Sequence, residues 1–168
     1  IVGSPDPKFY GGFSTDLSYK GITLNAVFNY SYGAKKLSPY YESLITSRGT
    51  GVASVDLVDR WSPENTDAKF PRPIYNDPTD TETMYYNTFS ASQMDFSVQN
   101  ASYLRLSTLS LAYTFPKTIV EKMKIGNLRV YSTISNVFCW TSYKGYDPET
   151  GDWYPPTRMF VFGLSVSL

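Results

Sequence analysis

The stretch Arg158-Met-Phe-Val-Phe-Gly-Leu-Ser-Val-Ser-Leu168 decides the fold class of this chain. Every second position carries a large apolar residue, namely Phe160, Phe162, Leu164, Val166 and Leu168. Because side chains alternate along a strand, one face is a continuous apolar stripe and the other is small and mostly polar. A strand of this kind is unusual at the end of a soluble protein, and it is expected of an outer-membrane β-barrel whose outer face meets lipid. The stretch therefore favours a barrel wall over an enzyme.

Composition agrees with that interpretation. Aromatic residues make up 17% of the 168 residues, which is high for a soluble domain and normal for a barrel with rings of aromatic side chains at its rims. Fifteen basic and fifteen acidic residues balance, which argues against a nucleic-acid binder. No apolar run approaches the roughly 18 residues of a spanning helix. With a single Cys139 and no His, we expect no disulfide, no metal, no cofactor and no catalytic residue.

The dipeptide Lys20-Gly21 predicts a tight hairpin, because Gly21 accepts a positive φ. That turn pairs apolar with apolar residues on one face and polar with polar residues on the other, as a defined register requires. The predicted pairs are Tyr19 with Ile22, Leu17 with Leu24, Thr15 with Ala26, Phe13 with Phe28, Asp16 with Asn25 and Gly12 with Asn29.

Alternation predicts strands at about 8–19, 22–32, 102–115, 127–138 and 158–168, with long connections at about 33–97 and 139–157. Within the third strand, Leu104 and Leu106 fall on the opposite face from Leu109 and Leu111. We therefore expect a bulge near Ser107, or an upper half that rises beyond the bilayer.

Long connections on one side and short turns on the other are typical of outer-membrane barrels, in which the long ones are extracellular. Five strands cannot close a barrel, so we expect the chain to be the tail of a longer polypeptide.

Long motifs in a consistent order resemble the SusC/RagA family of TonB-dependent outer-membrane transporters. They are Asp6-Pro-Lys-Phe-Tyr-Gly-Gly-Phe-Ser-Thr-Asp-Leu-Ser-Tyr-Lys-Gly21, Asn100-Ala-Ser-Tyr-Leu-Arg-Leu-Ser-Thr-Leu-Ser-Leu-Ala-Tyr-Thr-Phe-Pro116, Leu128-Arg-Val-Tyr131, Ser135-Asn-Val-Phe138 and Tyr143-Lys-Gly-Tyr-Asp-Pro-Glu149. The resemblance covers nearly the whole chain and is weakest at residues 34–50 and 77–93. One departure is Leu168, which stands where the family commonly has an aromatic residue.

This resemblance implies the last five or so strands of a barrel of about 22 strands around a plug. It implies a location in the bacterial outer membrane and the import of oligosaccharides or peptides with energy passed through TonB. The implied partners are the rest of the barrel with its plug, a SusD-like surface lipoprotein, TonB through an N-terminal region absent here, and lipid. No nucleic acid is expected.

Two groups of side chains are the candidate functional residues. Aromatic residues of the long connections could contact a partner or ligand, and could also form the connections' own core. They are Tyr40, Tyr41, Trp61, Tyr85, Tyr86, Trp140, Tyr143, Trp153 and Tyr154. Polar strand residues are expected to face the lumen, where the two arginines would be satisfied by carboxylates more readily than by substrate. They are Asp16, Asn25, Asn29, Arg105, Arg129 and Tyr131.

Other patterns favour structural roles. Asp147-Pro-Glu149-Thr-Gly-Asp152 offers three carboxylates that could hold a calcium ion, but their order does not match an EF-hand, and a solvated Asp-Pro turn is the preferred interpretation. Glu64 and Asp67 could act as a glycosidase pair, although nothing in the sequence sets their separation. The alternative of another class is a soluble, aromatic-rich, carbohydrate-binding β-sandwich, whose apolar faces would pack on each other instead of meeting lipid.

Overall fold

A computed structural model describes residues 3–45, 52–70, 95–151 and 154–167. The chain divides into two compact units. The sheet unit comprises residues 7–33, 102–141 and 156–168, and the loop unit comprises residues 1–6, 34–101 and 142–155. Each unit is described by itself.

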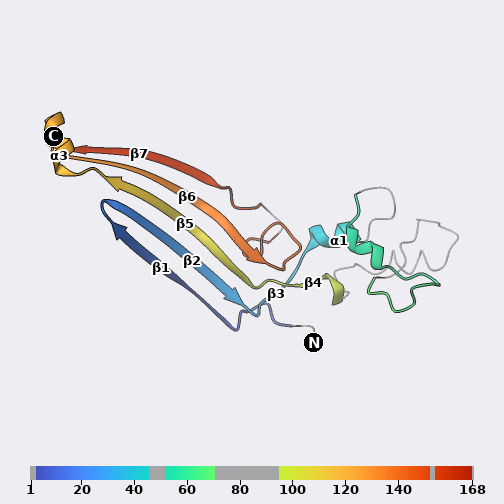
Figure 1. Ribbon diagram of the computed structural model, residues 1–168. Helices are drawn as coiled ribbons and strands as arrows, with labels where there is room; N and C mark the ends of the chain where they lie inside the picture. The colour runs from blue at the N-terminus through green and yellow to red at the C-terminus, as the bar shows by residue number, and fades with distance from the viewer. Residues whose placement is uncertain (1–2, 46–51, 71–94, 152–153, 168) are drawn as a thin grey trace. The chain divides into compact units, whose positions relative to one another are not determined.

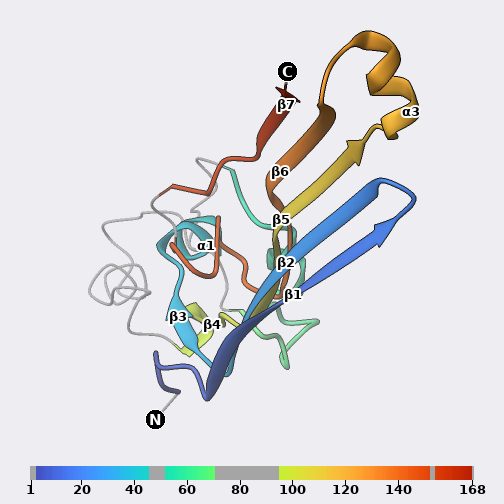
Figure 2. The same cartoon turned by 90° about the vertical axis from the view of Figure 1, so that its left-hand side faces the viewer.

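The sheet unit is one antiparallel sheet, which confirms the predicted all-β architecture. Its strands are β1 (Phe9–Tyr19), β2 (Ile22–Tyr32), β5 (Tyr103–Thr114), β6 (Asn127–Thr141) and β7 (Met159–Ser167). Among the described residues they lie in the order β1-β2-β5-β6-β7, so each strand pairs with the strand of this sheet that follows it in the sequence (Figures 1 and 2). The strands have 9 to 15 residues, which is sufficient to cross a bilayer at a tilt.

The β1–β2 hairpin has the register that the sequence predicts. Phe13 pairs with Phe28 and Asp16 pairs with Asn25, and the pairing runs without a slip from one end to the other. Both turn residues have positive φ, 46° for Lys20 and 86° for Gly21. Positive φ at both positions matches the right-handed twist of the strands, so the two-residue loop fixes the register.

Two neighbouring strands carry extra residues at one level of the sheet. Between matched pairs β2 is uninterrupted, β5 has one extra residue, Ser107, and β6 has two, Asn136 and Val137. One extra residue shifts the alternation of β5 by one position. Beyond the bulge, Leu104 and Leu106 therefore lie on the same face as Leu109. The predicted bulge is therefore confirmed, and the opposite placement of Leu104 and Leu106 that simple alternation gives is wrong.

The two faces of this sheet differ sharply. One face, called the apolar face, carries large hydrophobic side chains that stay exposed, including Leu17 (59%), Leu111 (52%) and Leu164 (64%). The opposite polar face carries Asp16, Asn25 and their neighbours. No second sheet among the described residues buries the apolar face, so the arrangement is not that of a β-sandwich.

The connections contain more regular structure than the sequence predicts. Between β5 and β6 the chain forms α3 (Lys117–Val120) and η4 (Glu121–Met123), and Val120, the last residue of α3, is buried. The loop unit contains β3 (Lys35–Leu37) paired with β4 (Val98–Asn100), and the short helices α1 (Pro39–Ile45), η1 (Val55–Asp59) and η3 (Asp95–Ser97). Every helix of the described residues is too short or too polar to cross a membrane.

Candidate functional site

Hydrogen-bonded pairs follow one row across the polar face. The register places Asp16, Asn25, Ser110 and Thr133 side by side on four successive strands. The Asn25 amide donates to Asp16 Oδ1 at 2.8 Å, and the hydroxyls of Ser110 and Thr133 lie 2.9 Å apart. These pairs satisfy one another within the sheet, so this part of the face is polar and already ordered.

The next group on the polar face surrounds Arg105. Asn29 pairs with Arg105 across β2 and β5, and its amide donates to Ser107 at the bulge at 2.8 Å. Arg105 is 5% exposed, and its guanidinium carbon lies 5.5 Å from the centre of the Tyr103 ring. A buried charge that rests on an aromatic face adds a cation–π contribution to the site. Arg105 is thus held by the sheet, and it is not a freely accessible side chain.

Tyr131 lies over Gly163 on the neighbouring strand. The two residues pair across β6 and β7, and a methyl group at Gly163 would overlap the Tyr131 ring. Glycine at this position therefore accommodates the ring of a cross-strand neighbour. Arg129 is exposed and shares the face, so all six polar residues predicted for the lumen lie on the polar face.

A three-residue cluster organises the loop unit. Lys144 Nζ lies 2.5 Å from Asp56 Oδ2, and the Tyr41 hydroxyl donates to the same oxygen at 2.6 Å. The hydrogen bonds from Lys144 and Tyr41 lower the pKa of Asp56. Burial, followed by the hydrogen bond to Asp56 and its charge, raises the pKa of Tyr41. Ser54 caps η1 by accepting from the Asp56 N–H, which presents the carboxylate to its partners.

The aromatic residues predicted for partner contact separate into two classes. Tyr41 (3% exposed) and Tyr143 (6%) are buried, which assigns them to packing within the loop unit. Tyr41 packs with Ile45, Leu57 and Phe70, and Tyr143 packs with Ala34 and Ala101.

The remaining members are accessible or lie elsewhere. Tyr40 stacks on Tyr146 with ring centroids 4.4 Å apart, and Trp61 and Tyr154 are exposed. Trp140 is not a loop residue, because β6 continues three residues beyond its predicted end and places this ring on the sheet. Tyr85, Tyr86 and Trp153 lie outside the described residues.

The acidic loop forms a turn. Asp147 is buried, and its Oδ1 accepts from the backbone N–H groups of Glu149 and Thr150 at 2.9 and 3.0 Å. The predicted Asp-Pro turn is therefore present, and the Asp147 carboxylate stabilises it. This carboxylate is buried, whereas the prediction was a solvated turn. Within the described part of the chain no group of three potential ligands gathers to hold a metal ion. Glu64 and Asp67 are both exposed.

Sequence reasoning missed a clamp at the bulge. Arg158, just before β7, donates to the carbonyl oxygens of Asn136 and Val137 at 3.4 and 2.7 Å. The Asn136 amide donates to the Thr157 carbonyl at 2.8 Å, and Asn136 has a φ of 53°. Asparagine is among the residues that tolerate the left-handed region, and this preference was the available signal. The clamp holds β6 and β7 together where their pairing begins.

No model of a protein family matches the chain. The chain is 31% identical, over 99% of its length, to TonB-dependent receptor P3 of Formosa agariphila, of which it covers 17%. It is 39% identical over 80 residues, 43% of the chain, to TonB-dependent receptor SusC of Bacteroides thetaiotaomicron, of which it covers 8%. A solved structure of the RagAB peptide transporter matches it with a TM-score of 0.75 and 29% identity, over 100% of this chain and 18% of that one.

The exposed apolar face and these likenesses define the chain as a segment of an outer-membrane β-barrel. Its sequence and its fold match those of TonB-dependent receptors, among them SusC and the RagAB transporter, as the resemblance in its motifs to the SusC/RagA family predicts. The chain spans about a sixth of the length of the curated relatives that it matches over 99% of its own residues.

Proposed function

We propose that the sheet unit forms part of the barrel wall of a transporter that imports nutrient oligomers across the outer membrane. The observation that carries this proposal is the sheet with one exposed apolar face and one hydrogen-bonded polar face. Such a sheet is stable where lipid covers the first face and a polar lumen or plug covers the second. This chain carries no catalytic step; its role is to exclude lipid and to position side chains.

The likenesses support a substrate and partners for the whole protein. One set of similar solved structures is described as a peptide importer, and SusC is named as a TonB-dependent receptor. On this basis we propose that the substrate of the whole protein is an oligosaccharide or a peptide. We also propose that the whole protein has a plug inside the barrel, a SusD-like lipoprotein at its surface and energy supplied through TonB.

We assign contact with the lipoprotein or the substrate to exposed rings of the connections. Tyr40 and Trp61 present ring surface to solvent, and the Tyr40–Tyr146 stack holds one of these rings in place. Rings supply a large contact area at a low cost in conformational entropy. The buried Tyr41 and Tyr143 support this surface from within the loop unit.

The test uses the whole receptor with Tyr40→Ala or Trp61→Ala. Each change should reduce co-purification of the lipoprotein or uptake of substrate while leaving the barrel assembled, because surface loops tolerate change better than strands. Val58→Ala is the matched control, since Val58 is 81% exposed in the same unit but has no ring. Unchanged uptake and unchanged co-purification in both aromatic variants would remove the contact role.

A further inference from the structure

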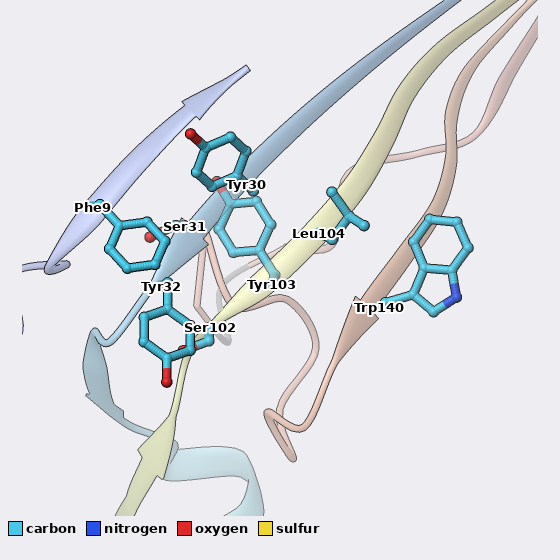
Figure 3. A pocket seen from close by; sticks show the side chains of 8 residues that line it. All are labelled: Phe9, Tyr30, Ser31, Tyr32, Ser102, Tyr103, Leu104 and Trp140. Carbon is cyan, nitrogen blue, oxygen red and sulfur yellow. The ribbon is translucent and has the colours of Figure 1, made fainter. Parts of the chain in front are cut away.

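A shallow hollow opens at the end of the sheet unit where β2 and β6 leave the sheet. Its volume is about 400 Å³. Figure 3 shows the aromatic rings of β1 and β2 on one side, Trp140 of β6 on the other, and Leu104 of β5 between them. The lining residues are Phe9, Tyr30, Ser31, Tyr32, Ser102, Tyr103, Leu104 and Trp140.

A glycine explains why the hollow exists. Tyr30 pairs with Gly11 on β1 and with Leu104 on β5. A Cβ atom at Gly11 would lie 2.9 Å from the Tyr30 hydroxyl oxygen and 3.2 Å from Cζ, so the ring occupies the space that a side chain on β1 would fill. Because Tyr30 leans toward β1, the surface above Leu104 stays open as far as Trp140.

The walls of the hollow are fixed by contacts between rings. Phe9 stacks on Tyr32 with centroids 4.9 Å apart, and Trp140 meets Phe138 edge to face at 4.6 Å. Aromatic pairs of this kind hold their positions better than single side chains. The hollow is therefore a preformed groove with an apolar floor at Leu104.

From this geometry we propose that the groove binds one acyl chain of an outer-membrane lipid at a defined position. The groove opens on the apolar face and is continuous with the stripe that includes Leu111 and Leu17, so it meets the same medium as that stripe. Tyr32 and Trp140, which line the groove, each carry one hydrogen-bond donor on an otherwise apolar ring. Rings with an apolar body and a polar tip are suited to this level of a membrane. The inference rests on the proposed lipid-facing orientation of the apolar face.

The test measures bound lipid on the whole receptor. Purified receptor is delipidated in mild detergent and titrated with phosphatidylethanolamine, and lipids retained per barrel are counted by native mass spectrometry. Leu104→Trp fills the groove and should weaken the tightest lipid by about tenfold, which corresponds to the loss of one well-packed contact region. Gly11→Ala should act in the same direction by pushing Tyr30 over the groove. Leu111→Trp is the matched control on the same strand and face, and it should bind lipid as the wild type does.

A separate measurement distinguishes failure of the groove from failure of the orientation. A bimane label at Leu111→Cys, in a cysteine-free receptor that includes Cys139→Ser, is exposed to phosphatidylethanolamine with brominated chains. Suppose that the label at position 111 is quenched and that wild type and Leu104→Trp retain equal amounts of lipid. This result overturns the proposed lipid site in the groove but leaves the lipid-facing orientation intact. No quenching at Leu111 overturns the lipid-facing orientation and the groove with it. Loss of lipoprotein binding in Leu104→Trp with unchanged lipid retention also overturns the proposal, because a protein would then occupy the groove. Heat-modifiable electrophoretic migration confirms that each variant has assembled.

Discussion

Asp56 and Lys144 are 88 residues apart in sequence, and their side chains form an ion pair of 2.5 Å. Asp56 belongs to the connection between β2 and β5, and Lys144 to the connection between β6 and β7. Tyr41 of α1 donates to the same carboxylate, so three separate segments meet at one oxygen atom. The pair therefore ties the two long connections together inside the loop unit.

We expect Lys144→Met to loosen this tie. The pair is partly exposed, with 27% of the Asp56 side chain accessible, so its loss should cost only about 1 kcal/mol. Hydrogen exchange of α1 and η1 in the whole receptor should accelerate by roughly fivefold, the factor that corresponds to this free energy. Lys69→Met removes an exposed lysine from the same unit and should leave exchange unchanged. Equal exchange in all three proteins would show that the ion pair does not hold the connections.

The tie should also depend on pH with a defined sign. Because its partners lower the pKa of Asp56, its contribution to stability is present above the ordinary value of 3.8 and is lost as the pH falls through the lowered pKa. The raised pKa of Tyr41 gives a contribution that is present below 10.0 and is lost as the pH rises further. A nitroxide label at Ser43→Cys should report constant mobility between these limits. The mobility difference between wild type and Asp56→Asn should disappear in acid, and a difference that persists there contradicts the assignment.

A charge on the apolar face tests the membrane orientation. Leu109→Arg, near the middle of β5 and on the apolar face, should destabilise folding of the whole receptor into bilayers by roughly 2–4 kcal/mol, the cost of an arginine near the middle of the lipid. Thr108→Arg on the same strand points to the polar face and should cost clearly less. Urea titration in lipid vesicles gives both free energies of unfolding. Equal costs on the two faces would argue against a lipid-facing stripe.

The positive φ of Asn136 predicts which residues this position of the bulge tolerates. Asn136→Gly should be nearly neutral for this φ of 53°, although it loses the hydrogen bond to Thr157. Asn136→Val should cost about 1–2 kcal/mol, because a β-branched residue is disfavoured in the left-handed region. The same urea titration compares the two. A valine variant as stable as the glycine variant would mean that the backbone at this position has no such requirement.

The chain by itself should not act as a transporter. Among the described residues, the outward edges of β1 and β7 pair with no further strand. An unsatisfied backbone group in hydrocarbon costs several kcal/mol, so the isolated 168 residues should aggregate or fail to insert into bilayers. The whole receptor, reconstituted in parallel, is the control. A stable, monomeric, importing species of 168 residues would show that the segment is autonomous.

Alternation along the chain was sufficient to predict the sheet. The period of two is local, so Phe160 to Val166 report their common face without any knowledge of distant residues. The register of the first hairpin followed in the same way, because a two-residue loop at Lys20-Gly21 leaves only one pairing that matches both faces. Even the bulge at Ser107 was signalled, as a break in the alternation.

The tertiary structure decided which side chains act together. Leu104 shares a face with Leu109 because β5 and β6 carry extra residues relative to β2, and this is visible only when the three strands are paired. The burial of Tyr41 and the position of Trp140 on a strand likewise depend on partners far away in sequence. A tyrosine in a polar connection has the same sequence signature whether it packs inward or faces a partner, because only long-range contacts remove it from solvent. The sequence of this protein therefore determined its strands and their faces, and the packing of distant segments determined its clusters, its clamp and its groove.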